Sequence, residues 1–202
     1  MANNQAYFGF RQFAGLGSSP TYEQIAVPIT YTAGAIFYGD PVTPQADGSV
    51  AQASSTGATP GVPGIAGIFI GCKYLSVAQK RTVWSNYWPG SDAVAGSVEG
   101  YIVNDPGARF IAQSDGTGLA LVDVNATIGF VIGTGNTANG LSGAYLDTTT
   151  LNTVAYNVYA PFKVVGILNS PPGAQGTLSN GQAYDWAIVA FNYVGTKNFV
   201  GV

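Results

Sequence analysis

The chain has 202 residues, of which 47% are hydrophobic and only 8% are charged, and it contains no histidine. This composition provides enough apolar material for a folded core, while the lack of histidine excludes Ser-His-Asp triads and histidine-ligated metal sites. The single cysteine, Cys72, excludes an intrachain disulfide and a cysteine metal cluster. A formal net charge of −3 argues against a phosphate-binding surface, so we expect no direct contact with nucleic acid.

Residues 1–19 are predicted to form an extended N-terminal arm. They combine glycines with the aromatic residues Tyr7, Phe8, Phe10 and Phe13. Such a segment is too apolar to stay solvated and too rich in glycine to fold alone, so we expect it to dock on a partner. Arg11 offers a bidentate group for a carboxylate of that partner. We therefore expect an arm whose removal leaves the remaining chain folded.

The rest of the chain, 20–202, shows the periodicity of short β-strands. Residues 25–31 and 98–103 are rich in β-formers, with apolar side chains at alternating positions in the first segment. Further strands are predicted at 35–38, 65–74, 82–87, 109–113, 127–132, 153–159, 162–168, 184–193 and 198–202. Turns rich in Gly, Pro and Asp separate these segments. The pattern predicts a single all-β domain, an antiparallel sandwich or barrel with a possible internal division near 114–126.

The acidic residues do not indicate an active site. Five aspartates lie in or beside turn motifs, where Asp is favoured because its side chain bonds to the local backbone. These are Asp40, Asp47, Asp105, Asp115 and Asp123. Asp92 and Glu99 are the one pair worth testing as the two carboxylates of a glycosidase. We predict no catalytic, cofactor or metal site, and no enzymatic activity.

Residues 73–90 contain the most informative aromatic cluster. If 82–87 is extended, Trp84 and Trp88 lie on the same strand face. Together with Tyr87 they are candidates for a self-association or partner interface. The same residues could instead fill the core or stack on sugar rings. Cys72, in an apolar strand, is expected to be a buried small hydrophobe.

Three segments of this region carry a resemblance to a known family. They are Gly71-Cys72-Lys73-Tyr74, then Trp84-Ser85-Asn86-Tyr87-Trp88-Pro89-Gly90, then Tyr101-Ile102-Val103-Asn104-Asp105-Pro106 followed by Phe110 and Gln113. Upstream, Gly39-Asp40-Pro41-Val42 adds to the pattern. In these features the chain resembles the head decoration (capsid cement) proteins of tailed bacteriophages. Asn104 stands where the family pattern has an aspartate, and the resemblance covers residues 39–113.

The resemblance implies a non-enzymatic virion structural protein that binds and stabilises the assembled capsid. Its partners would be the major capsid protein, contacted by the arm residues, and further copies of itself, as a homotrimer or a dimer. Low charge supports self-association, because unguarded sheet edges invite pairing. The N-terminus lacks the basic and apolar runs of a secretory signal, and no apolar stretch is long enough to span a membrane. We therefore expect synthesis in the bacterial cytoplasm, a location on the outer capsid surface, and no membrane contact. The alternative is a carbohydrate-binding or adhesion module of a phage fibre or tail.

Overall fold

The protein is an all-β sandwich. The computed structural model describes residues 4–15, 24–54, 64–152, 160–168, 182–192 and 194. In this part of the chain, two six-stranded antiparallel sheets pack as a sandwich, which confirms the predicted fold class. The helical elements among these residues are two 3-10 turns, Leu121–Asp123 and Thr148–Thr150. No described helix has the length and apolar character needed to cross a membrane.

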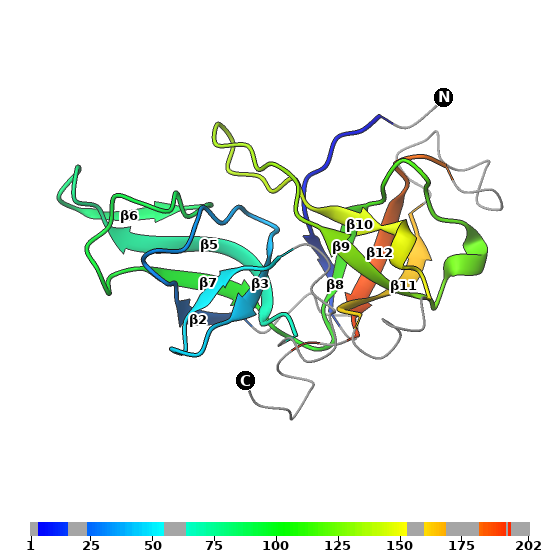
Figure 1. Cartoon of the computed structure of the whole chain (residues 1–202), viewed down its shortest axis with the longest axis horizontal. Helices are drawn as coiled ribbons and strands as arrows, with labels where there is room; N and C mark the ends of the chain where they lie inside the picture. The colour runs from blue at the N-terminus through cyan, green and yellow to red at the C-terminus, as the bar shows by residue number, and fades with distance from the viewer. Residues whose placement is uncertain are drawn as a thin grey trace.

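The first sheet has the strand order β1-β8-β12-β11-β9-β10 (Figure 1). Its strands are β1 (Arg11–Ala14), β8 (Arg109–Gln113), β12 (Trp186–Phe191), β11 (Phe162–Ile167), β9 (Thr127–Val131) and β10 (Tyr145–Asp147). Burial alternates along β12, where Ala187, Val189 and Phe191 are buried and the residues between them are half-buried. Side chains of a β-strand point alternately to its two faces, which gives this alternation of burial with a period of two residues.

The second sheet has the order β2-β7-β5-β3-β4, and β6 pairs with the far half of β5. Its strands are β2 (Gln24–Pro28), β7 (Glu99–Val103), β5 (Gly67–Leu75), β3 (Pro41–Pro44), β4 (Val50–Gln52) and β6 (Thr82–Ser85). The end of this sheet that carries β6 projects away from the first sheet (Figure 1). We call this end the free end.

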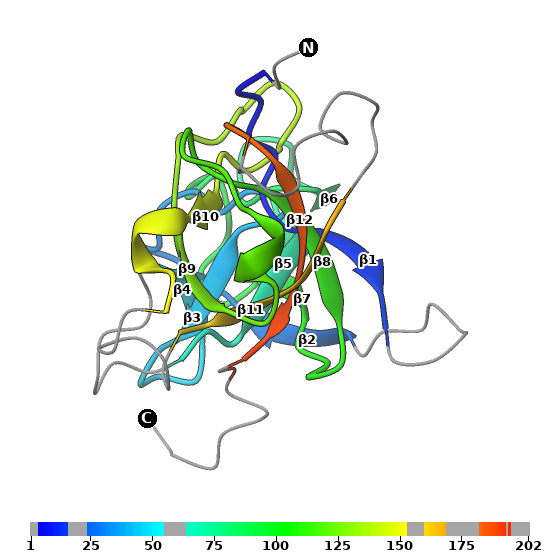
Figure 2. The ribbon, with the colours of Figure 1, turned by 90° about the vertical axis from the view of Figure 1, so that its right-hand side faces the viewer.

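The predicted division into a separate arm, 1–19, and a domain, 20–202, does not match the order in which the chain builds the two sheets. β1 lies within the expected arm, yet it pairs with β8 and forms an edge of the first sheet. All strands of the second sheet come from residues 24–103, between β1 and β8 in sequence. The chain thus changes sheets between β1 and β2 and again between β7 and β8, whereas 114–126 lies wholly between β8 and β9. Figure 2 views the molecule from the first sheet's end, with β1 along one side.

Two groups of buried side chains hold the fold together. The larger contains Phe10, Phe110, Phe162 and Phe191 of the first sheet and also Ile68 from the base of the second. The smaller lies within the second sheet and includes Phe69, Tyr74, Trp88 and Ile102. Because the larger cluster draws on both sheets, it joins them in one packed structure.

Most of the strands were predictable from local pattern. The interval 109–113 matches β8 residue for residue, and the predictions for β2, β5, β6, β7, β9, β11 and β12 overlap the observed strands. Residues 35–38 form isolated bridges rather than a strand. The predicted strands 153–159 and 198–202 lie outside the described residues. Strands β1, β3, β4 and β10 were not predicted, and each is only three or four residues long.

Candidate functional site

The N-terminal segment lies on the first sheet and is partly built into its core. Phe10 is only 1% exposed, and its ring stacks on Phe162 with centroids 4.4 Å apart. Phe8 is buried, meets Trp186 edge-to-face at 5.1 Å, and lies under the Arg11 guanidinium at 4.9 Å. The prediction that Phe8 and Phe10 dock on a partner is therefore corrected, because their apolar surface is already covered by this chain.

Hydrogen bonds fix the same segment along its length. The Gln113 side chain accepts from the Ala6 N–H at 3.0 Å and donates to the Asn4 carbonyl at 2.9 Å. Tyr7 stacks on Tyr145 with centroids 4.1 Å apart, while Phe13 is 44% exposed. Of the arm residues proposed to contact a capsid, Arg11 and Phe13 are thus the exposed ones.

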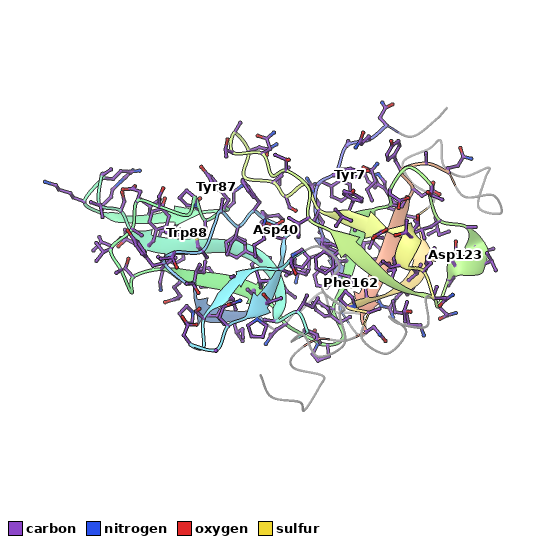
Figure 3. All side chains as sticks on the ribbon, in the orientation of Figure 1. Tyr7, Asp40, Tyr87, Trp88, Asp123 and Phe162 are labelled. Carbon is purple, nitrogen blue, oxygen red and sulfur yellow. The ribbon has the colours of Figure 1, made fainter. Side chains whose placement is uncertain are left out.

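The aromatic residues at 84–88 have three different environments. Trp84 is 69% exposed, whereas Trp88 is fully buried and meets Tyr74 edge-to-face at 5.3 Å. Tyr87 is half-buried and stacks on Phe37 at 5.5 Å. The predicted common face for Trp84 and Trp88 is wrong because β6 ends at Ser85, so alternation does not continue to Trp88. Trp88 is therefore a core residue and cannot serve as an interface anchor; Figure 3 labels it and Tyr87.

Trp84 belongs to a group on the outer face of the second sheet that we call the Trp84 site. Its ring is parallel to that of Tyr101 on β7, with 4° between the planes and 5.8 Å between centroids. Lys73 on β5 pairs directly with Trp84 on one side and Glu99 on the other, and its Nζ lies 5.6 Å from the Trp84 ring centroid. Trp84 was singled out from the sequence as a candidate interface residue, but its neighbours Tyr101 and Lys73 were not. Predicting them requires knowing that β6 and β7 flank β5 in the sheet.

A hydrogen-bonded ion pair forms the polar part of the Trp84 site. Lys73 Nζ lies 2.9 Å from Glu99 Oε1, which also accepts from the Tyr101 hydroxyl at 3.1 Å. The hydrogen bond from Lys73 lowers the pKa of Glu99, and the same bond raises the pKa of Lys73. Both groups stay charged at neutral pH, and their charges cancel locally.

The acidic residues have the structural roles expected of them. Asp47, Asp105 and Asp115 each accept a backbone N–H two residues ahead, as turn-forming aspartates do. Asp123 accepts from the Ala120 N–H, and Asp40 accepts from the Phe37 N–H. Among the described residues, no group of three or more His, Cys, Asp or Glu could hold a metal ion.

Asp92 and Glu99, the two carboxyl groups considered as a glycosidase pair, both have pKa values below their ordinary values. Hydrogen bonds from the Ser76 hydroxyl and the Ala78 N–H lower the pKa of Asp92. Because the pKa of Glu99 is lowered as well, neither carboxyl is held protonated at neutral pH. A general acid requires the opposite shift.

Cys72 is buried, as predicted. Desolvation raises the pKa of its thiol to about 12, so it is protonated at physiological pH. Its Sγ donates to the Tyr87 carbonyl at 3.4 Å. Cys72 therefore packs the inner face of β5, while its neighbour Lys73 points outward.

A second exposed feature lies at the free end of the second sheet. Leu75, Val77 and Val94 are exposed by 40%, 57% and 43%. Two backbone hydrogen bonds join their segments: the Val94 N–H donates to the Leu75 carbonyl at 2.9 Å, and the Val77 N–H donates to the Asp92 carbonyl at 3.3 Å. We call these three residues the free-end patch.

Comparison with family models, curated proteins and solved structures gives no match.

Proposed function

We propose that this chain is a non-enzymatic structural protein of a tailed-phage virion, which binds the outside of the assembled head and stabilises it. One observation carries the proposal. The three contiguous runs that resemble head decoration proteins, separated in sequence, lie on or directly beside the adjacent strands β6, β5 and β7, whereas the isolated matching positions Phe110 and Gln113 lie on β8 of the first sheet. The three contiguous runs therefore lie close together in the second sheet, whose free end carries the free-end patch.

The chemistry of the described residues supports a binding role. Their acids accept hydrogen bonds in turns, between loops or in the Lys73–Glu99 pair, and their cysteine is a buried, protonated thiol. Contacts built from apolar and neutral polar groups suit a sheet-rich protein with only 17 charged residues, seven basic and ten acidic. We propose the major capsid protein as the partner of the free-end patch, with Arg11 and Phe13 as additional contacts.

The stabilising mechanism is mass action. A protein that binds only the assembled lattice favours that lattice over dissociated subunits by the free energy of binding. Binding several capsid subunits at once strengthens the effect through multivalency. A cyclic oligomer matches capsid symmetry, so we propose a homotrimer at three-fold positions, with a dimer at two-fold positions as the other arrangement.

The experiment measures how the purified protein binds expanded heads of the phage that encodes it. The proposal expects saturation at a fixed ratio of chains to capsid subunits. Replacing Leu75, Val77 and Val94 by serine is expected to weaken binding at least tenfold. The matched control is the double change Leu121→Ser and Val122→Ser in an exposed turn, because Asp123 places that turn at the opposite end of the molecule (Figure 3). Lack of binding by the unmodified protein would refute the proposal.

Self-association has a separate test. Sedimentation at low and high salt is expected to show the same oligomer, because few ion pairs are available to be screened. A monomer at micromolar concentration in both conditions would exclude a trimer and a dimer in solution. Any self-association would then occur only on the capsid surface.

A further inference from the structure

We propose that the Trp84 site binds a neutral carbohydrate, with the Trp84 ring as the stacking surface for a sugar. This activity is separate from capsid binding and does not depend on it. It is argued from the exposure of the ring, the shape of the surface beside it, and the polar groups around it.

The aromatic part of the site is exposed yet held in place. Trp84 is the most exposed aromatic side chain among the described residues, although both Tyr101 and Lys73 contact its ring. The parallel Tyr101 ring and the Lys73 ammonium beside it restrict the conformations of this side chain. A large, rigid, amphipathic ring binds with little loss of conformational freedom. The flat C–H face of a pyranose matches such a ring.

An open depression lies beside the two rings, with a glycine in its lining. Gly71 lies on β5 opposite Tyr101, at a shift in the strand register, with φ of +147°. A Cβ at this position would approach the Ser85 carbonyl oxygen to 3.0 Å. An open depression of about 360 Å³ lies at Gly71, lined also by Ile70, Cys72, Ser85, Asn86 and the two aromatic residues. Its volume is at the lower end of the range for small-ligand sites.

The polar groups select a neutral ligand that carries hydroxyls. Lys73 and Glu99 place a donor and an acceptor side by side next to the aromatic ring, and their charges cancel. Neighbouring hydroxyls of a sugar can accept from one and donate to the other. An anion or a cation would have to compete with the existing ion pair. Ser85 and Asn86 also line the depression; the Ser85 hydroxyl oxygen accepts from the Tyr87 N–H at 3.2 Å, and the Asn86 amide donates to the Asn139 carbonyl at 2.7 Å.

The surroundings of Trp84 also differ from those of a protein-binding anchor. The strongest residues of a protein interface lie at its centre, surrounded by contacts that exclude water. Here the direct cross-strand neighbour of Trp84 is a charged lysine, and the next residue across the sheet is a charged glutamate. At this end of the molecule, the large aliphatic residues that are exposed, Leu75, Val77 and Val94, form the free-end patch. This distribution favours a hydrated ligand at Trp84 and a protein contact at the free end.

The test is calorimetric titration of the full chain with maltohexaose, cellohexaose and mannohexaose. We expect at least one of them to bind with a submillimolar dissociation constant that changes less than twofold with salt. Trp84→Ala is expected to weaken binding at least tenfold, and Tyr101→Ala severalfold. Val122→Ala is the matched control, because it removes another exposed apolar side chain, 86% accessible, far from the site. Circular dichroism confirms that each variant is folded.

Three results would overturn the inference. They are no binding of any of the three sugars at millimolar concentration, unchanged binding by Trp84→Ala, and an oligomer that Trp84→Ala dissociates while sugars leave it intact. The last would assign Trp84 to a contact between copies. Capsid binding by Trp84→Ala is measured in parallel and is expected to be normal, so failure here is distinguishable from failure of the proposed function.

Discussion

Replacing Phe10 by alanine is expected to destabilise the protein severely, because this residue of the N-terminal segment lies in the core of the first sheet. Its ring contacts Phe162 in parallel at 4.4 Å and Phe130 edge-to-face at 6.2 Å. Truncation of a fully buried phenylalanine costs about 3–5 kcal/mol, including the cavity that is left behind. Domains of this kind are stable by about 5–15 kcal/mol in total, so the change removes a large share of the stability.

Urea unfolding followed by fluorescence measures the effect. With a slope of about 2 kcal/mol per molar urea, a loss of about 4 kcal/mol lowers the unfolding midpoint by about 2 M. Phe13→Ala, three residues further along the same segment, is the matched control. Phe13 is 44% exposed, so its truncation is expected to change the stability by no more than about 0.5 kcal/mol.

Two outcomes would refute the reasoning. One is a loss of less than about 1 kcal/mol for Phe10→Ala, which lies outside the range for buried phenylalanines. The other is an equal loss for both variants, which would mean that burial does not set the cost. Either result would support a segment that leaves the first sheet easily, as a separable arm would.

Three further predictions concern titratable groups. Burial raises the pKa of Asp40 above 3.8, and hydrogen bonds from Ser142, the Phe37 N–H and Gln52 offset this only in part. Protonated Asp40 therefore favours the folded state fully below pH 3.8, and this contribution is lost as the pH rises through the folded-state pKa. Asp40→Asn cannot ionise, so its stability relative to the natural protein should increase between acid and neutral pH. Urea unfolding at several pH values measures this difference. A parallel pH dependence of the two proteins would contradict this. Cys72, with a pKa of about 12 and a buried Sγ, is expected not to react with a thiol reagent at pH 8 until the protein is unfolded; rapid reaction of the folded protein would show that β5 opens. The double change Asp92→Asn and Glu99→Gln should leave capsid binding unaltered, and a glycan-cleaving activity that this change abolished would disprove the non-enzymatic assignment.

Local sequence pattern was sufficient for the strands whose alternation is long and regular. β8 and β12 bury every second or nearly every second side chain, and their positions were predicted from that alternation. β3 was missed because prolines stand at both of its ends, which is typical of a turn. β1 was missed because its glycine-rich surroundings indicated an arm, whereas its pairing partner lies almost a hundred residues later.

The candidate site shows the same division. Trp84 and Tyr87 were identified as notable aromatic residues from sequence alone. Alternation placed Trp84 and Trp88 on one face, but a bridge to Ile36, far away in sequence, holds Trp88 in the core instead. Likewise, the contact between Trp84 and Tyr101 depends on both of their strands flanking β5. Local pattern reports the period of one strand, not which strands become neighbours.

The position of the second sheet within the chain has a consequence for biosynthesis. β1 leaves the ribosome early, but its pairing partner β8 begins at Arg109. At about 5–20 residues per second, β1 waits roughly 5–20 s for β8, while all six strands of the second sheet, within residues 24–103, are completed. The second sheet can therefore form during translation, whereas the first is closed only when late strands meet the earliest one. Until then Phe8 and Phe10 stay exposed, so this segment of the nascent chain is vulnerable to aggregation and proteolysis while the later strands are made.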